Sequence, residues 1–181
     1  PDILCMGKGM SSGYIPLAGI AFRDRIGEAF LGRDEDEVEF SHGHTYGGNP
    51  LASVAGLACL GEIVERDLPA RAREMGAYLR EQLEGLKDLG IIGEVRGRGL
   101  LAAIEVVADR SDLTQFDPAL GMTSAIVNEG LERGVFYYAG GTGVVRDVVC
   151  LGPAFIVTTD QIDEMVSTLV ASVDAAIAKL P

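Results

Sequence analysis

The residue with the clearest chemical potential is Lys8, a lysine with a glycine on each side. A lysine side chain forms a Schiff base with an aldehyde only as the neutral amine, so this role needs surroundings that disfavour the charged ammonium. Gly7 and Gly9 lack Cβ atoms and therefore let a flat ligand approach the backbone closely. The pattern predicts a nucleophilic lysine, while a lysine on an ordinary flexible glycine loop remains the alternative.

A nucleotide-binding phosphate loop also contains a glycine followed by a lysine. That motif requires a glycine five residues before the glycine-lysine pair and a serine or threonine directly after the lysine. Asp2 and Gly9 occupy these two positions. The sequence therefore argues against a nucleotide phosphate loop at Lys8.

A second polar segment, residues 41–48, combines Thr45 with two histidines and several glycines. A turn of this composition exposes backbone N–H groups and a hydroxyl, which suit an anion such as a phosphate. His42 and His44 could suggest a metal site. They are the only histidines in the chain and no cysteine lies nearby, so they supply only two neutral ligands and we expect no metal.

Three arginines lie near glycines in the second half of the chain: Arg96, Arg98 and Arg146. A guanidinium group binds a carboxylate through two parallel hydrogen bonds, so any of them could recognise an acidic substrate. Arg96 and Arg98 are interpreted as surface charges. Arg146 is the candidate for substrate binding, with a purely structural or solvated arginine as the equal alternative.

The elements that must position Lys8 are two short apolar runs, residues 3–6 and 17–22, which predict buried strands on either side of its loop. Residues 51–65 predict a helix, with Asn49 as its cap and Pro50 at its first position. Further along, Thr159 or Asp160 is expected to cap a final helix. The remaining pattern predicts helices from Pro69, over 119–133 and over 160–179, and strands over 100–107, from 135 and over 148–151.

Composition limits the classes of partner. The 181 residues carry a formal net charge of −12, which repels nucleic acid phosphates. No apolar run is long enough for a membrane span and no signal peptide is visible, so we expect no membrane contact and a cytoplasmic location. The three cysteines are far apart, which argues against a disulfide framework. A small-molecule ligand is the expected partner.

Three motifs in order resemble one enzyme family. The segment around Lys8, PDILCMGKGMSSGYIPL, is similar to the sequence around the cofactor lysine of class III, or omega, aminotransferases. HTYGGNP, residues 44–50, resembles their phosphate-contacting segment. VRGRGL, residues 95–100, resembles the strand that opens their small domain. Together these motifs cover nearly the whole chain.

The resemblance implies an α/β fold in which residues 1–65 form the end of the large, pyridoxal-phosphate-binding domain of a fold type I transferase. Residues 66–181 would then be the small α+β carboxyl-terminal domain. It implies that Lys8 holds pyridoxal 5'-phosphate as a Schiff base and that Thr45 contacts the cofactor phosphate of the partner subunit in a homodimer. Many relatives bind the substrate carboxylate with a mobile arginine; Tyr138 stands at its usual position, and Arg146 is the candidate replacement.

The function implied is transfer of an amino group from an omega-amino acid or amine to a keto acid, with pyruvate as the expected acceptor. The stretch GMSSGY, residues 9–14, is more similar to the amine:pyruvate members of the class than to the semialdehyde aminomutases. An aminomutase or decarboxylase of the same class, or a non-catalytic half-enzyme module, remains the alternative.

Family members carry three further cofactor contacts upstream of the lysine: an acidic residue at the ring nitrogen, an aromatic residue on the ring and another phosphate-binding loop. Only seven residues precede Lys8 in this sequence. The resemblance therefore implies an amino-terminal half of the same enzyme as a partner, because the acidic residue keeps the cofactor ring protonated.

Overall fold

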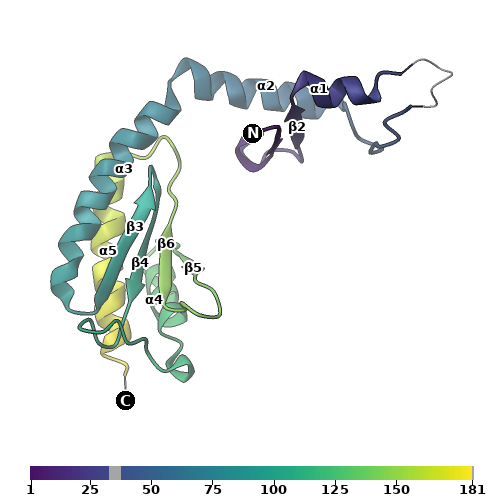
Figure 1. Cartoon of the computed structure of the whole chain (residues 1–181). Coiled ribbons are helices and arrows are strands. Elements are labelled where there is room, and N and C mark those ends of the chain that lie inside the picture. The colour runs from purple at the N-terminus through teal and green to yellow at the C-terminus, as the bar shows by residue number, and fades with distance from the viewer. Residues whose placement is uncertain (33–37, 181) are drawn as a thin grey trace. The chain divides into compact units, whose positions relative to one another are not determined.

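The computed structural model describes residues 1–32 and 38–180, which form two compact units, Pro1–Asp67 and Leu68–Pro181. Figure 1 shows the elements of both units along the chain. Each unit has its own secondary structure and packing, and each is described separately below.

The first unit contains a two-stranded antiparallel ribbon and a long helix. Strand β1 (Ile3–Met6) pairs with β2 (Gly19–Phe22), so that Ile3 lies opposite Phe22 and Met6 opposite Gly19. The strands flank a short 3-10 helix, and two further short helical turns follow β2. These turns are η1 (Lys8–Met10), α1 (Asp24–Gly27) and η2 (Glu28–Phe30).

Helix α2 (Pro50–Glu65) begins as its sequence predicts. The Asn49 side-chain oxygen accepts hydrogen bonds from the backbone N–H groups of Leu51, at 2.9 Å, and Ala52, at 3.3 Å. Pro50 at the first position has no N–H group to satisfy. The cap satisfies two of the otherwise unpaired donors at the start of the helix.

The second unit is built on a four-stranded antiparallel sheet in the order β3-β4-β6-β5. The hairpin of β3 (Ile92–Arg98) and β4 (Leu101–Val106) forms one side. Strands β6 (Val148–Leu151) and β5 (Tyr138–Gly140) complete the sheet. Successive residues of β4 alternate between exposed and buried positions, as expected for a sheet covered by helices on one face.

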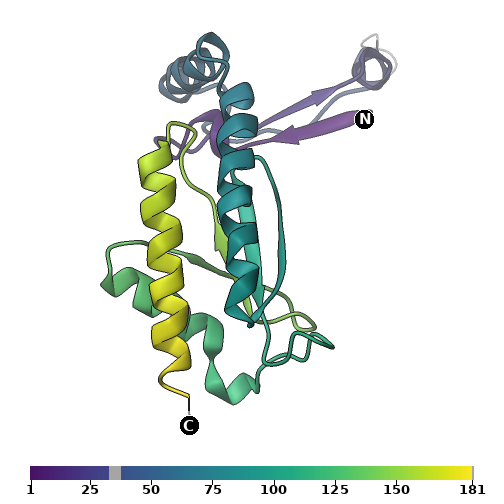
Figure 2. The ribbon, with the colours of Figure 1, turned by 90° about the vertical axis from the view of Figure 1, so that its left-hand side faces the viewer.

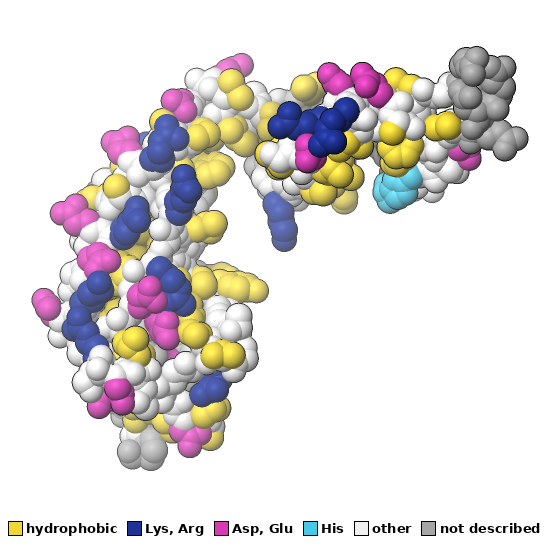
Figure 3. Space-filling view, in the orientation of Figure 1, with side chains coloured by type: hydrophobic (Ala, Val, Ile, Leu, Met, Phe, Trp, Pro, Cys, Tyr) yellow, Lys and Arg dark blue, Asp and Glu magenta, His cyan; other side chains and the backbone are white. Residues whose placement is uncertain are grey.

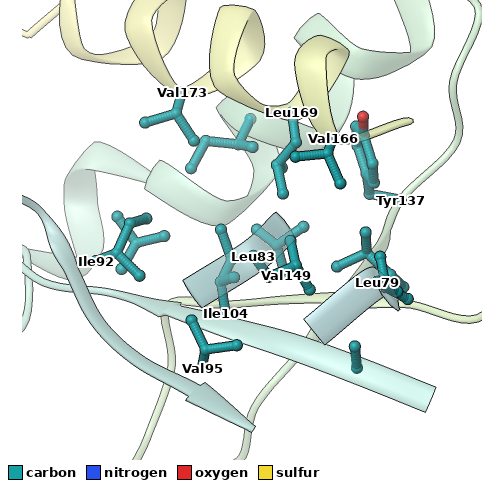
Figure 4. Packing of buried hydrophobic residues seen from close by; sticks show 14 of the residues in the cluster. Leu79, Leu83, Ile92, Val95, Ile104, Tyr137, Val149, Val166, Leu169 and Val173 are labelled. Carbon is teal, nitrogen blue, oxygen red and sulfur yellow. The ribbon is translucent and has the colours of Figure 1, made fainter. Parts of the chain in front are cut away.

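Three helices supply the buried layer: α3 (Leu68–Glu84), α4 (Met122–Glu132) and α5 (Thr159–Ile177). Figure 2 shows α3 and α5 running side by side in front of the sheet. Leu79, Leu83, Ile104, Val149 and Leu169 are each 0% exposed. Figure 4 shows these side chains converging between the helices and the strands. Two 3-10 segments, η4 (Gly85–Leu89) and η5 (Pro118–Leu120), connect the elements.

Several sequence predictions for this unit need correction. The cap of α5 is Thr158, whose side chain accepts a hydrogen bond from the Gln161 N–H, and not Thr159 or Asp160. The strand expected from residue 135 begins only at Tyr138, which is opposite Cys150 of β6. Tyr137 before it is buried, and its hydroxyl donates to the Met165 carbonyl at 2.6 Å. Residues 92–98 form a strand of their own, in addition to the strand expected over 100–107.

No helix within residues 1–32 and 38–180 is both long enough and apolar enough to cross a membrane.

Candidate active site

Lys8 lies in a backbone loop with an unusual conformation. Its φ angle is +53°, and Ser12, four residues later, has φ +48°. Side chains other than glycine rarely adopt this left-handed region, at a cost of about 1–3 kcal/mol each, and such residues gather at ligand sites. Backbone hydrogen bonds between residues three apart in the sequence close the loop. They include Met10 N–H to the Gly7 carbonyl at 3.2 Å and Tyr14 N–H to the Ser11 carbonyl at 2.9 Å. The strain marks this loop as a candidate functional site.

Lys8 differs from the other two lysines of the chain in its surroundings. The amine of Lys87 pairs with Glu84, and that of Lys179 pairs with Glu129. The Lys8 amine has no hydrogen bond or ion pair to any residue in the described ranges. An accessible amine that no described carboxylate holds is compatible with covalent attachment to an aldehyde.

The structure corrects the expectation that Lys8 lies between buried strands. Both strands are present, but β1 is exposed along its length and β2 nearly so, and Lys8 itself is exposed. A two-stranded ribbon has two faces, and the first unit contains too few elements to cover both. Within this chain, the loop therefore does not remove Lys8 from water.

Helix α2 supports the lysine loop through a glycine that the sequence pattern did not single out. A Cβ atom on Gly56 would lie 2.5 Å from Leu17 Cδ2 and 3.7 Å from the Met10 carbonyl oxygen. The glycine thus allows α2 to approach the loop closely. Ser11 is buried beside it and donates its hydroxyl to the Ile15 carbonyl at 2.6 Å. A glycine in the middle of a predicted helix was the available signal for this contact.

Thr45 lies in the turn that precedes α2. The Gly47 N–H donates to the His44 carbonyl at 2.9 Å, and the Asn49 N–H donates to the Tyr46 carbonyl at 3.1 Å. Gly48 has φ +71°, which favours glycine at this position. Thr45 is exposed, and its hydroxyl has no partner in the described part of the chain. The turn thus presents the hydroxyl outward at the start of a helix, a place that favours anions.

The histidines of this segment stack on aromatic neighbours. The rings of His42 and His44 lie 5.0 Å apart edge to face, and Phe40 lies 5.6 Å from His42. Across residues 1–32 and 38–180, no group of three or more His, Cys, Asp and Glu side chains could hold a metal ion. The side chains of both histidines therefore pack through contacts between rings.

The three arginines of the second unit have different surroundings. Arg96 pairs with Glu94 at 2.7 Å and with Glu105 at 2.8 Å, and its hydrogen bond to the Glu105 carboxylate raises the pKa of the guanidinium. The Arg96 guanidinium is therefore occupied by two carboxylates of the sheet. The side chains of Arg98 and Arg146 are exposed and make no hydrogen bond or ion pair with any residue among 1–32 and 38–180. Only these two remain free to bind a ligand.

Lys8 and Thr45 belong to the first unit, and Arg146 belongs to the second. The residues of the first unit fit part of a pyridoxal-phosphate site. Lys8 offers an unpaired amine, a Cβ on Gly9 would meet no atom within 4 Å, and the Thr45 turn offers a hydroxyl. These residues can therefore provide three of the contacts that the cofactor needs: a covalent link, space for a flat ring and a hydrogen bond to the phosphate.

Comparison with known proteins supports this interpretation. Residues 1–173 match the family model of class III aminotransferases. Diaminobutyrate–2-oxoglutarate transaminase of Halomonas elongata is 34% identical over 92% of this chain, and the match covers 35% of that enzyme. The chain therefore spans about a third of the length of this relative.

Two solved structures resemble the whole chain. A structure described as a transaminase with L-alanine has 34% identity and a TM-score of 0.90, and this chain covers 42% of it. An amine transaminase from an uncultivated Pseudomonas species, described in its pyridoxal-phosphate-bound form, has 36% identity and a TM-score of 0.82, with 39% covered. The α/β architecture is that of the fold type I transferases. The chain belongs to the class III aminotransferases, a family of enzymes that depend on pyridoxal 5'-phosphate.

Proposed function

We propose that the enzyme containing this chain transfers an amino group from an omega-amino acid or amine to a keto acid, with Lys8 as the residue that holds pyridoxal 5'-phosphate. The observation that supports this assignment most directly is the Lys8 amine, which has no partner among residues 1–32 and 38–180, on a backbone with φ +53°. The other two lysines are both held by carboxylates. Lys8 is the lysine available for covalent chemistry.

When bound, the cofactor supplies an electron sink that stabilises negative charge at the substrate carbon. Lys8 contributes two functions. Its amine forms the covalent link to the cofactor, and, once an incoming amine has displaced it, the same nitrogen is a base that moves a proton away from the substrate carbon. A lysine suits both steps because its nitrogen is compact and lies at the end of a flexible stem.

The other two residues contribute binding. Thr45 donates its hydroxyl to the cofactor phosphate of the partner subunit in a homodimer. The exposed turn that carries it precedes the N-terminus of α2, an end of a helix that favours negative charge. Arg146 binds the substrate carboxylate through its guanidinium. This role is supported by its exposed side chain, which no described carboxylate neutralises.

Pyruvate is the keto acid that we favour. The solved transaminase with L-alanine supports this choice, because alanine is the amino acid that forms when pyruvate accepts an amino group. The Halomonas elongata relative is named for 2-oxoglutarate, which is the competing acceptor. The two acids differ by a second carboxylate, so a direct assay separates them.

An amino-terminal half of the enzyme completes the active unit. The first unit supports this requirement, because most of its apolar side chains are exposed, including Ile20 at 62%, Leu51 at 70% and Leu57 at 71%. Figure 3 shows hydrophobic side chains on the face of this unit turned toward the viewer. An apolar surface of this kind indicates a contact with another folded element. The same cover would remove Lys8 from water.

Borohydride reduction of the cofactor-loaded enzyme, followed by peptide mapping, tests the lysine assignment. The reduced cofactor should appear on the peptide that contains Lys8. The variant Lys8→Arg keeps the positive charge but should take up no label, which controls for adsorbed cofactor. A label on Lys87 or Lys179 would contradict the proposal.

A turnover assay tests the reaction class and the acceptor. The enzyme should convert an omega-amino acid only when a keto acid is added, and pyruvate should support faster turnover than 2-oxoglutarate. Conversion without any added keto acid would indicate an aminomutase or a decarboxylase instead. Absence of turnover despite bound cofactor would indicate a non-catalytic module.

A further inference from the structure

The loop that carries Arg146 is held by a side chain that lies 31 residues earlier in the sequence. The Gln115 amide donates from Nε2 to the Val144 carbonyl at 3.0 Å, and its Oε1 accepts from the Arg146 N–H at 3.3 Å. One side chain thus bonds the backbone on both sides of residue 145. An amide side chain suits this double contact because its nitrogen donates and its oxygen accepts at the same end of the side chain.

Gln115 is itself held in place from both sides. Before it, a compact turn is closed by a β-bridge between Asp109 and Thr114, and the Asp112 carboxylate accepts from the Thr114 N–H at 2.9 Å. After it, Phe116 is 8% exposed and belongs to the hydrophobic core. The amide of Gln115 is therefore a fixed point for the loop rather than a mobile surface group.

The Arg146 loop also has internal restraints. The Thr142 N–H donates to the Val145 carbonyl at 2.6 Å, and the Val148 N–H donates to the Arg146 carbonyl at 2.8 Å. Gly141 has φ +109°, and a Cβ atom there would lie 2.6 Å from the carbonyl oxygens of Val145 and Arg146. Both backbone groups of Arg146 are thus hydrogen-bonded, while its guanidinium has no partner in the described part of the chain.

We propose that Gln115 is a positioning residue that holds Arg146 in place for the carboxylate of the substrate. This inference rests on the proposed role of Arg146. A long side chain binds an anion more tightly when its Cα atom is already fixed, because less conformational entropy is lost on binding. Gln115 fixes that end and leaves the guanidinium free to select substrates that carry a carboxylate.

The test uses the complete, cofactor-loaded enzyme and three variants: Gln115→Ala, Gln115→Glu and Arg146→Ala. Each is assayed with an omega-amino acid and with a carboxylate-free amine of the same chain length. Gln115→Ala should raise KM for the omega-amino acid by about 2- to 10-fold, the factor expected for lost hydrogen bonds, and leave KM for the amine unchanged. Arg146→Ala should show the same selectivity with a larger factor.

Hydrogen exchange at the Arg146 amide gives a measurement that does not depend on activity. Gln115→Ala should accelerate this exchange. Gln115→Glu keeps an acceptor for the Arg146 N–H, so it should preserve slow exchange, while the lost bond to the Val144 carbonyl and the added negative charge near the guanidinium should still raise KM for the omega-amino acid.

The outcomes separate the two proposals. If Arg146→Ala affects both substrates equally, the proposed role of Arg146 is wrong and the inference about Gln115 fails with it. If Arg146→Ala is selective but Gln115→Ala leaves exchange and KM unchanged, or affects both substrates equally, the positioning role alone is overturned.

Discussion

The two units of this chain bury their apolar residues to very different degrees. The second unit closes a continuous core between one face of its sheet and three helices, with more than a dozen apolar side chains below 5% exposure, such as Leu79 and Ile104. In the first unit, Ala52 is the only buried apolar side chain among the described residues. The unit that carries Lys8 and Thr45 is therefore the one with little apolar core of its own.

Helix α2 shows this difference within a single element. Ala52 and Gly56 are buried on one side, against the lysine loop, while Leu51, Val54, Leu57 and Val64 on the opposite side are 64–76% exposed. A helix that is apolar on both sides is normally buried on both sides. In α3, by contrast, Met75, Leu79 and Leu83 form a single buried stripe. The proposed site residues Lys8 and Thr45 thus lie in the unit whose apolar side chains are largely exposed in this chain.

The largest expected effect comes from a matched pair of leucines. Leu79→Ala should lower the free energy of unfolding of the second unit by about 2–5 kcal/mol, because it leaves a cavity in a closed core. Leu57→Ala, at a position 71% exposed in the first unit, should change the free energy of unfolding of that unit by less than about 0.5 kcal/mol in the chain alone. Urea denaturation measures both. Equal losses for the two variants would contradict the contrast between the units.

The effect of Leu57→Ala on the free energy of unfolding should differ between the chain alone and the complete enzyme. When the amino-terminal half is present, Leu57→Ala should become destabilising, because the leucine is then covered. A Leu57→Ala penalty that stays near zero in the complete enzyme would show that this side of α2 faces solvent.

A smaller effect is expected from Gly76→Ala in α3. The added methyl group would lie 2.1 Å from the Gly99 carbonyl oxygen, and that neighbour is backbone, so the helix or the β3–β4 turn must shift. Overpacking of this kind costs about 1–3 kcal/mol. Gly61→Ala in α2 is the control, since no atom lies within 4 Å of its Cβ position. Thermal unfolding that ranks Gly61→Ala as the more damaging variant would be inconsistent with this packing.

Thr45→Ala should affect cofactor binding without affecting the core. Loss of a hydrogen bond to a charged phosphate weakens binding by about 1–3 kcal/mol. Spectroscopic titration of the complete enzyme with pyridoxal 5'-phosphate measures this change. Unfolding of the second unit should stay the same, because Thr45 belongs to the first unit. Unchanged cofactor affinity would contradict the proposed hydrogen bond between Thr45 and the cofactor phosphate.

The smallest effect concerns the pH dependence of the second unit. The Glu129 carboxylate bonds to Lys179 and to Arg133, and these hydrogen bonds lower the pKa of Glu129 below its ordinary value of 4.5. A lowered pKa in the folded state means that the contribution to stability is present above pH 4.5 and is lost as the pH falls toward the pKa of the folded state. Glu129→Gln should reduce the loss of stability between pH 5 and pH 3, as urea midpoints at several pH values would show.

Local sequence was sufficient for the start of α2 and for the proposal of Lys8. The cap of α2 depends on neighbouring residues, so Asn49 and Pro50 were identified correctly. Lys8 could be proposed because its flanking glycines and the surrounding motif are contiguous. The family match over residues 1–173 confirmed the class that this motif indicated.

Tertiary structure decided the features that depend on residues far apart in the sequence. The strand order β3-β4-β6-β5 and the late start of β5 follow from pairing between distant segments, which no local pattern encodes. The exposure of β1, β2 and one side of α2 depends on how many layers surround them, although their apolar sequence predicts burial. The bonds from Gln115 to the Arg146 loop arise only when the chain brings two distant segments together, because a hydrogen bond depends on position in space and not on residue type alone.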